Sequence, residues 1–398
     1  MKGQSIVVYL VGSFFSIMIV MGIMWSVQEV IGRTVVIYVA HDQDYSEPIL
    51  KEFEEKTGMK IKVKYDTELT KTVGLVNRLI AEKDNPRADV FWNNEVSRSI
   101  QLKNEFISKP YCSVSSINIS EKYKDKECYW TGFAARARVL IYNTDLVNES
   151  EAPISIYELT DEKWKGKVCI ANPLFGTTGS HIAALFAIMG DERAKEFLLN
   201  LKENEIQIVS SNSMVRDQVV AGECWIGITD TDDANDAIVD GKPVKMIFPD
   251  QNPADTARAL LIKQAKDSKQ MHDLYGYAGV PFISGDRILE LTDEEILGYF
   301  DSFNISLPRG TLIIPNTVML INGAPHEENG KILIDFLLSK EVEKKLSETK
   351  ALQMPTRDVE TPKNVPKLTE LNGLSVNEYQ IFEKLNASRE FVQNEFVE

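Results

Sequence analysis

Three aspartates stand close together in the chain, at Asp230, Asp232 and Asp233. Carboxylate oxygens are ligands that hard cations such as Fe³⁺, Mn²⁺ and Ca²⁺ accept, and they also bind organic ammonium groups. Carboxylates this close together repel one another unless a cation lies between them. The alternative is a structural role, because Asp232 or Asp233 also fits the start of a helix toward Ile238, where the helix dipole favours acidic side chains.

A second polar group, Thr178, Gly179 and Ser180, precedes an apolar helix expected over residues 181–189. Backbone N–H groups and hydroxyls at a helix start favour a bound anion. An ordinary N-cap explains the same residues, because Ser and Thr are preferred there. No lysine follows at the spacing of a Walker motif, so this group is not a nucleotide-binding P-loop.

Segments with the pattern of β-strands precede these groups, and helical segments alternate with them. This alternation predicts a mostly parallel α/β sheet, in which ligands lie at the carboxyl ends of the strands. We therefore expect a cleft between two α/β lobes to collect four polar groups, two from each half of the chain. These groups are His41-Asp42, Asn94-Glu95, residues 177–180 and residues 230–233.

The composition of the chain limits the classes of function. Its 398 residues suit two lobes or two to three domains. Hydrophobic residues make up 43% and charged residues 26%, which is the balance of a soluble globular protein. The formal net charge of −15 argues against non-specific nucleic-acid binding, which requires a basic surface.

The N-terminus has a different character from the rest of the chain. Lys2 is followed by an uncharged, apolar run over residues 3–28, and about 20 such residues span a bilayer. We expect residues 5–27 to act as an export signal or as an anchor in the cytoplasmic membrane, with the body from about Arg33 on the outer side. The sequence does not decide whether this segment is cleaved.

In such an exported body, Cys112 and Cys128 could form a disulfide. Two free thiols are the alternative, because spacing in the sequence does not decide between them. Cys169 and Cys224 each lie in an apolar, strand-like run, and we expect both to be core residues.

Five segments, in this order and spacing, carry a resemblance to a known family: residues 38–44, 88–95, 130–138, 310–321 and 336–341. With them the chain resembles the type II periplasmic solute-binding proteins of ABC importers (extracellular solute-binding protein family 1), and within that family the ferric-iron-binding branch. The resemblance implies two α/β lobes that close on a ligand by a hinge. The hinge strands would lie near residues 136–142 and 310–318.

The resemblance also divides the chain. Lobe 1 would comprise residues 33–137 and 309–345, and lobe 2 residues 138–251. Residues 1–32 would be the signal or anchor, residues 252–308 an insertion of unknown role, and residues 346–398 a C-terminal helical segment. The insertion is expected to be a surface decoration, with a lid or a permease contact as the alternatives.

The site residues implied by the resemblance come from all four polar groups. His41 matches a histidine ligand, Tyr142 matches a phenolate ligand, and Glu95 or Asn94 would supply a group after its strand. Residues 178–180 and Asn212 would hold an anion beside the metal. The implied metal ligands are His41, Glu95, Tyr142, Asp232 and Asp233, and Asp230 joins the wider ligand-binding set. For His41 the alternative is a hydrogen bond to a neighbouring loop, and for Tyr142 it is a buried strand aromatic.

One departure from the family pattern bears on the ligand. Ferric-binding members carry two adjacent tyrosines where this chain has Asp232 and Asp233. The resemblance implies a receptor that delivers Fe³⁺ or another hard cation, with a synergistic anion, to an ABC permease and its ATPase, and it implies no cofactor. The alternative ligand is a small organic molecule such as an amine-bearing phosphonate, its ammonium group held by the aspartates.

An enzyme is a further alternative, because Asp230-x-Asp232-Asp233 is superficially similar to the aspartate-rich Mg²⁺ sites of phosphotransfer enzymes. No lysine or nucleophile motif accompanies these aspartates, and no histidine pair has the spacing of zinc ligands. We therefore expect a binding protein rather than an enzyme.

Overall fold

The computed structural model describes residues 32–66, 73–267, 285–302 and 309–397. The predicted signal or anchor over residues 5–27 lies outside these residues and stays a prediction. Within the described ranges, no helix is both long and apolar enough to cross a membrane.

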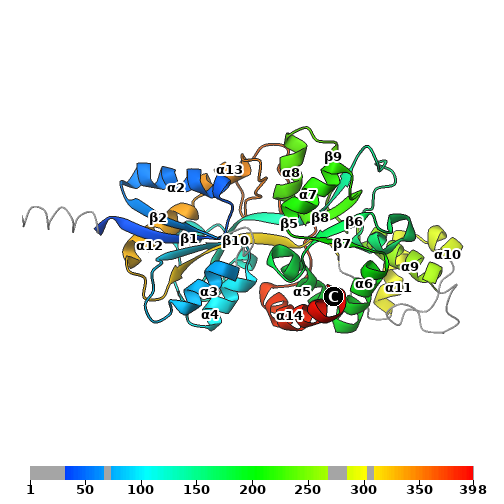
Figure 1. Cartoon of the computed structure of the whole chain (residues 1–398), viewed down its shortest axis with the longest axis horizontal. Helices are drawn as coiled ribbons and strands as arrows, with labels where there is room; N and C mark the ends of the chain where they lie inside the picture. The colour runs from blue at the N-terminus through cyan, green and yellow to red at the C-terminus, as the bar shows by residue number, and fades with distance from the viewer. Residues whose placement is uncertain (1–31, 67–72, 268–284, 303–308, 398) are drawn as a thin grey trace, which may run out of the picture.

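Two lobes lie side by side along the long axis of the molecule (Figure 1), and one sheet runs through both. Its strands follow the order β2-β1-β3-β10-β5-β8-β6-β7, with β4 paired to β10 and β9 paired to β5. The strands of the first lobe are β1 (Thr34–Val39), β2 (Lys60–Tyr65), β3 (Val90–Asn93), β4 (Ser108–Lys109) and β10 (Ile313–Ile321). Those of the second are β6 (Val168–Ala171), β7 (Gln207–Val209), β8 (Ile226–Asp230) and β9 (Val244–Ile247).

Strand β5 (Thr131–Asn143) belongs to both lobes, and all of it is buried. Its first half pairs with β10 as far as Ala137, and its second half pairs with β8 from Arg138 onward. The register of β10 shifts between Pro315 and Asn316, because proline cannot donate to the ladder and bends the strand there. These two antiparallel strands pass between the lobes (Figure 1).

Helices cover both faces of the sheet in each lobe. In the first lobe they are α2 (Gln43–Thr57), α3 (Val73–Ala81), α4 (Ser97–Asn104), α12 (Glu327–Leu337) and α13 (Lys340–Ser347). In the second they are α5 (Gly176–Met189), α6 (Asp191–Glu203), α7 (Asn212–Ala221) and α8 (Thr231–Val239). α2 ends at Gly58, whose φ of 67° is the left-handed conformation that glycine adopts without strain.

The described part of the 252–308 segment is helical, with α9 (Pro253–Asp267), α10 (Gly285–Glu290) and α11 (Asp293–Ser302). Leu261, Ile288 and Phe300 from these helices are buried in the same apolar cluster as the core of the second lobe. Burial of this apolar area stabilises the attachment, so these helices form part of the second lobe rather than a loose surface decoration.

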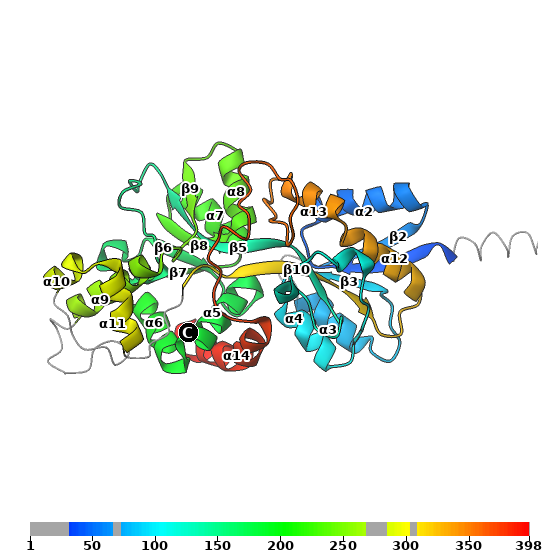
Figure 2. The same ribbon diagram turned by 180° about the vertical axis from the view of Figure 1, so that it is seen from behind.

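The C-terminal segment joins the two lobes. Residues 348–377 cross β5 and β10 on the face seen in Figure 2, where Met354 forms a bridge with Ala135 and Gly373 forms one with Thr311. Helix α14 (Glu378–Phe391) then packs against α5 of the second lobe and α4 of the first.

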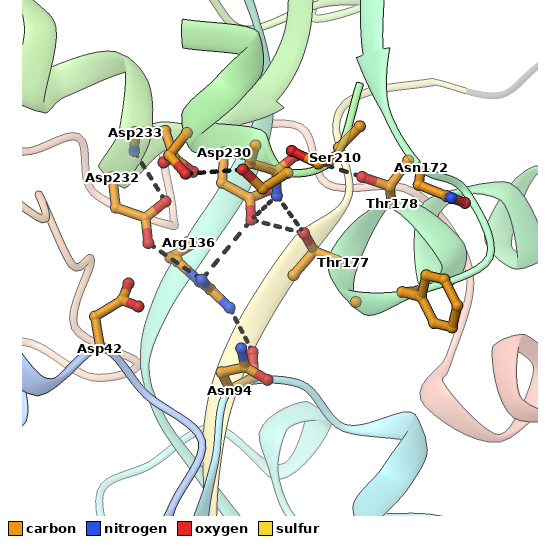
Figure 3. A pocket seen from close by; sticks show the side chains of 16 residues that line it. Asp42, Asn94, Arg136, Asn172, Thr177, Thr178, Ser210, Asp230, Asp232 and Asp233 are labelled. Atoms are coloured by element: carbon orange, nitrogen blue, oxygen red, sulfur yellow. Dashed lines mark hydrogen bonds and ion pairs between the residues drawn. The ribbon is translucent and has the colours of Figure 1, made fainter. Parts of the chain in front are cut away.

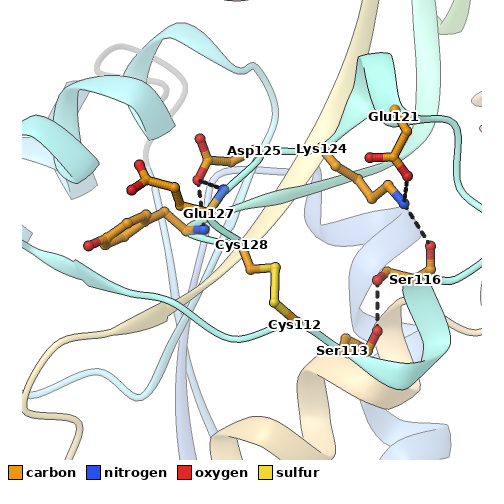
Figure 4. The surroundings of a disulfide bond; sticks show 9 residues. Cys112, Ser113, Ser116, Glu121, Lys124, Asp125, Glu127 and Cys128 are labelled. Carbon is orange, nitrogen blue, oxygen red and sulfur yellow. Dashed lines mark hydrogen bonds and ion pairs between the residues drawn. A yellow bond between two sulfur atoms is a disulfide. The ribbon is translucent and has the colours of Figure 1, made fainter.

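Cys112 and Cys128 form a disulfide with a Cα–Cα distance of 5.1 Å (Figure 4), so the structure favours the paired alternative. Cys169 and Cys224 are free and buried, as expected.

Candidate ligand-binding cleft

A cavity of about 100 Å³ lies between the lobes and takes residues from both (Figure 3). Asp42 and Asn94 come from the ends of β1 and β3 in the first lobe, and Arg136 comes from β5. The remaining polar lining comes from the second lobe: Asn172, Thr177, Thr178, Ser210, Ser211, Asn212, Ser213, Asp230, Asp232 and Asp233. The carboxyl ends of strands and the starts of helices therefore meet here, as expected for an α/β fold.

The aspartate cluster lies at the junction of β8 and α8. Asp230 is the last residue of β8, and Asp232 and Asp233 occupy the first turn of α8. One carboxylate oxygen from each of the three lies within 4.8 Å of the others. The two alternatives from the sequence are thus compatible, because the same acids begin the helix and line the cavity.

The charge of Asp230 is neutralised by Arg138, which is not among the predicted site residues. The two side chains form an ion pair at 2.6 Å. The other oxygen of Asp230 accepts hydrogen bonds from the Thr177 hydroxyl at 2.7 Å and from Asn212 Nδ2 at 3.1 Å. Burial alone would raise the pKa of Asp230, but Arg138, Arg136 and the Thr177 hydrogen bond hold it below its ordinary value. Asp230 is therefore an ionised, fixed part of the framework.

Arg136 contacts the cluster from the other side (Figure 3). Its Nη1 lies 3.1 Å from Asp232 Oδ2 and 3.7 Å from Asp230 Oδ2. Its Nη2 donates to the backbone oxygen of Asn94 at 2.5 Å. Burial raises the pKa of Asp232, and the negative charges of Asp230 and Asp42 add to the effect against the opposing charge of Arg136. Arg136 thus links both lobes through one guanidinium group.

The opposite end of the cavity presents helix starts. α5 begins after Phe175 without a side-chain cap, and Thr177 and Thr178 stand in its first turn. α7 begins after Ser211, whose hydroxyl accepts the N–H of Met214. The Thr178 hydroxyl donates to Asn212 Oδ1 at 3.3 Å, so the two helix starts are tied together. The positive ends of two helix dipoles and their first-turn N–H groups suit an anionic group here.

The predicted anion-binding group of residues 178–180 separates in the structure. Thr178 lines the cavity, whereas Gly179 and Ser180 line a smaller space beside it. The Ser180 hydroxyl donates to Glu95 Oε2 at 3.3 Å across the lobes. Glu95 also accepts the N–H groups of Ser97 and Arg98 at the start of α4, so its carboxylate is engaged in helix capping.

Two other predicted metal ligands do not reach the cavity. His41 is buried, and its ring stacks on Trp92 with centroids 5.2 Å apart. Tyr142 is 2% exposed in the core of the second lobe. It pairs with Ile226 and Lys245 near the C-terminal end of β5, beyond Arg138 and away from the cavity lining. The structure brings together Asn94, Thr178, Asn212, Asp230, Asp232 and Asp233 around the cavity, but not His41, Glu95, Tyr142, Gly179 or Ser180.

One feature of the sequence indicates a role for Arg136 and Arg138, which are not among the predicted site residues. Arg136 and Arg138 are two residues apart in an otherwise apolar strand, so they share one face of it. Buried arginines require charged partners, and the aspartate cluster is the matching group.

Comparison with known proteins agrees with this architecture. A family model described as bacterial extracellular solute-binding protein matches residues 49–281. The Fe(3+)-binding periplasmic protein of Serratia marcescens is 26% identical over 196 residues, which cover 49% of this chain and 56% of that protein. Iron uptake protein A1 of Synechocystis is 28% identical over 228 residues, covering 54% and 61%. The chain thus spans little more than half the length of these curated relatives.

Solved structures confirm the two-lobed periplasmic-binding-protein fold. Iron-bound HitA from Pseudomonas aeruginosa superposes with a TM-score of 0.69 at 18% identity, covering 90% of this chain and 99% of that one. AfuA from Actinobacillus pleuropneumoniae, with fructose-6-phosphate bound, gives 0.68 at 21% identity, covering 91% and 98%.

Proposed function

This chain belongs to the bacterial extracellular solute-binding protein family, and on that premise we propose that it is an extracytoplasmic receptor. It captures a small solute in the cleft between its lobes and delivers it, without chemical change, to an ABC permease and its ATPase. The body lies on the outer side of the cytoplasmic membrane, and residues 5–27 direct or anchor it there. Protease added to spheroplasts should digest the body, and full protection would contradict this location.

The Arg136–Asp232 ion pair carries the proposal for the ligand class. A bare Fe³⁺ ion at the cluster would share a carboxylate with a buried guanidinium 3.1 Å away, and like charges in a buried site repel strongly. None of the described residues that line the cavity is a tyrosine. We therefore favour a small organic solute with an anionic group, such as a phosphonate or phosphate, at the starts of α5 and α7.

The rest of this solute would carry an ammonium group or hydroxyl groups. Four aspartates, 42, 230, 232 and 233, line the cavity, whereas Arg136 and the underlying Arg138 supply two positive charges. The excess of negative charge at this end favours a cationic or hydrogen-bond-donating group.

Fe³⁺ with a synergistic anion is the second candidate. Three carboxylates with oxygens within 4.8 Å of one another offer the hard oxygen ligands that such a cation accepts. The two curated relatives described above are named for iron binding or iron uptake. This candidate requires Arg136 to leave Asp232 when the metal binds.

Calorimetric titration separates the candidates. We expect a measurable heat of binding when an aminoalkylphosphonate or a sugar phosphate is added. The radius of gyration in small-angle scattering should decrease at the same time, because the lobes close on the ligand. Native mass spectrometry with metal analysis of the purified protein is the parallel measurement. Tight binding of ferric citrate with no response to the organic ligands would replace the first candidate with the second. Failure of all ligands to bind would contradict the receptor proposal.

A further inference from the structure

We propose that Arg136 is the specificity-determining residue of the cleft, because its guanidinium occupies the place where a metal ion would contact the aspartates. The chain thus supplies its own cation, which excludes bare multivalent metals and leaves the cavity to organic solutes. This inference rests on the proposed receptor role.

The position of Arg136 is fixed by three contacts. Its guanidinium lies 3.1 Å from Asp232 Oδ2 and 3.7 Å from Asp230 Oδ2, and it donates to the Asn94 oxygen at 2.5 Å. Its backbone lies in β5, where Arg136 pairs with Ile314 of β10. The backbone is therefore held by the sheet, and in this arrangement of the lobes the guanidinium leaves the aspartates through a change of side-chain rotamer.

The chemistry of arginine suits this role. The group stays protonated under all ordinary conditions. Burial alone would lower the pKa of Arg136, but the negative charges of Asp232 and Asp230 raise it above its ordinary value. Arg136 is only 4% exposed, so water screens its charge poorly. A divalent or trivalent metal at the same carboxylates would place two or three further positive charges beside it. Displacing the guanidinium would in addition break its link to Asn94 in the first lobe.

Removal of this charge leaves a different site. Arg138 still neutralises Asp230, but Asp232 and Asp233 then face the cavity with Asp42 and without the internal cation. Carboxylates in this arrangement form an oxygen-rich site of net negative charge, which is the kind that binds hard metal ions. The arginine therefore decides between the two ligand classes.

The test uses Tb³⁺ as a probe of hard-cation binding to the full-length protein. Tyr45 stands in the first turn of α2, and its N–H donates to the backbone oxygen of Asp42 at 3.3 Å. Because Asp42 lines the cavity, this phenol is near enough to serve as a sensitiser of Tb³⁺ luminescence. We expect Arg136→Gln, which keeps a donor for Asn94, to bind Tb³⁺ at least about a hundredfold more tightly than the wild type. Arg136→Lys keeps the charge and should show no such gain. Adding Asp232→Asn to Arg136→Gln should abolish the gain and thereby identify the site.

Two results would overturn the proposal: wild-type protein that binds Tb³⁺ at the cleft as tightly as Arg136→Gln, or an equal gain in Arg136→Lys. Circular dichroism checks that each variant is folded. If Arg136→Gln does not fold, the wild type alone decides, because saturable Tb³⁺ binding that Asp233→Asn weakens would contradict an occupied cation position. A titration of the wild type with aminoalkylphosphonate runs in parallel. If the wild type does not bind aminoalkylphosphonate, the proposed organic ligand is wrong, but the conclusion from Tb³⁺ binding is unchanged.

Discussion

Arg138 and Asp230 form an ion pair at 2.6 Å in which each side chain is 1% exposed. Asp230 also accepts hydrogen bonds from Thr177 in α5 and Asn212 in α7. One carboxylate thus joins strand β5 to the two helix starts at the end of the cavity that suits an anionic group. The pair therefore belongs to the framework of the cleft. This framework positions the residues that line the cavity and would contact the ligand.

Asp230→Asn should therefore destabilise the fold. It leaves the positive charge of Arg138 uncompensated in the interior, and breaking a buried pair in this way costs about 3–5 kcal/mol. Chemical denaturation measures the loss in unfolding free energy. Asp233→Asn is the matched control, since it is the same change on a partly exposed residue of the same cluster, where about 0.5 kcal/mol is expected. Equal losses in the two variants would contradict the framework role of Asp230.

The disulfide should contribute measurably to stability. Cys112 and Cys128 are separated by 16 positions, and closing a loop of about this length stabilises a protein by about 3 kcal/mol. The double variant Cys112→Ala, Cys128→Ala should unfold at correspondingly lower denaturant concentration. Reduced wild-type protein should match it, because both lack the cross-link. A wild-type transition that does not respond to reductant, while the double variant is destabilised, would assign the effect to packing instead.

The strands and the polar groups at their ends were predictable from sequence, because apolar runs and the residues that end them are local signals. Asp230 to Asp233 and Thr178 were placed at the cleft on that basis. The partners of these residues were predictable only in kind, because arginines in an apolar strand require charged groups. Arg136 and Arg138 meet the aspartates over more than ninety positions of sequence, and the pairing of β5 with β8 that produces this contact leaves no local pattern.

Tyr142 shows that a match to a family ligand in the sequence does not determine the surroundings of a side chain. Its position in the sequence matches a ligand of the resembling family, but burial in the second lobe decides its surroundings. The burial of Asp232 was likewise not predictable from the sequence. A helix start at a cleft is usually exposed, whereas Asp232 is 6% exposed and paired with Arg136.

Asp250 should make stability depend on pH. This residue is buried, and its carboxylate accepts hydrogen bonds from the Ile156 N–H and the Thr256 hydroxyl. Burial raises its pKa from 3.8 to about 7, against these hydrogen bonds and with a small addition from Glu158. Between pH 4 and pH 7 the folded state therefore binds more protons than the unfolded state, and stability falls as the pH rises through this window.

Asp250→Asn removes the titrating group and should isolate its effect. The φ of 58° at this position suits Asn as well as Asp. The difference between a pKa of 3.8 and one of about 7 corresponds to about 4 kcal/mol, which is the upper bound for the loss in stability of the wild type relative to the variant between pH 4 and pH 8. Urea denaturation of both proteins across this range gives the difference. Parallel pH profiles would show that Asp250 titrates normally.

Helix α14 should hold the lobes together. The Tyr379 hydroxyl contacts Asp125 in the first lobe, and Lys103 donates to the same hydroxyl at 3.2 Å. On its other side, α14 is fixed to the second lobe by the Lys384–Asp191 ion pair at 2.7 Å and by buried Ile381. Because α14 is attached to both lobes, opening the cleft must break the contacts of Tyr379.

Tyr379→Phe removes these contacts and keeps the ring. A hydrogen bond of this kind contributes about 0.5–1.5 kcal/mol, and Tyr379 is 39% exposed, which favours the lower part of that range. If closure accompanies binding, ligand affinity should fall by up to about tenfold, and the radius of gyration of the ligand-free protein should rise. Lys384→Ala is the control, because it breaks a contact of the same helix within one lobe and should alter neither quantity. An unchanged affinity in Tyr379→Phe, or an equal effect in Lys384→Ala, would mean that α14 stabilises the second lobe without restraining the opening of the cleft.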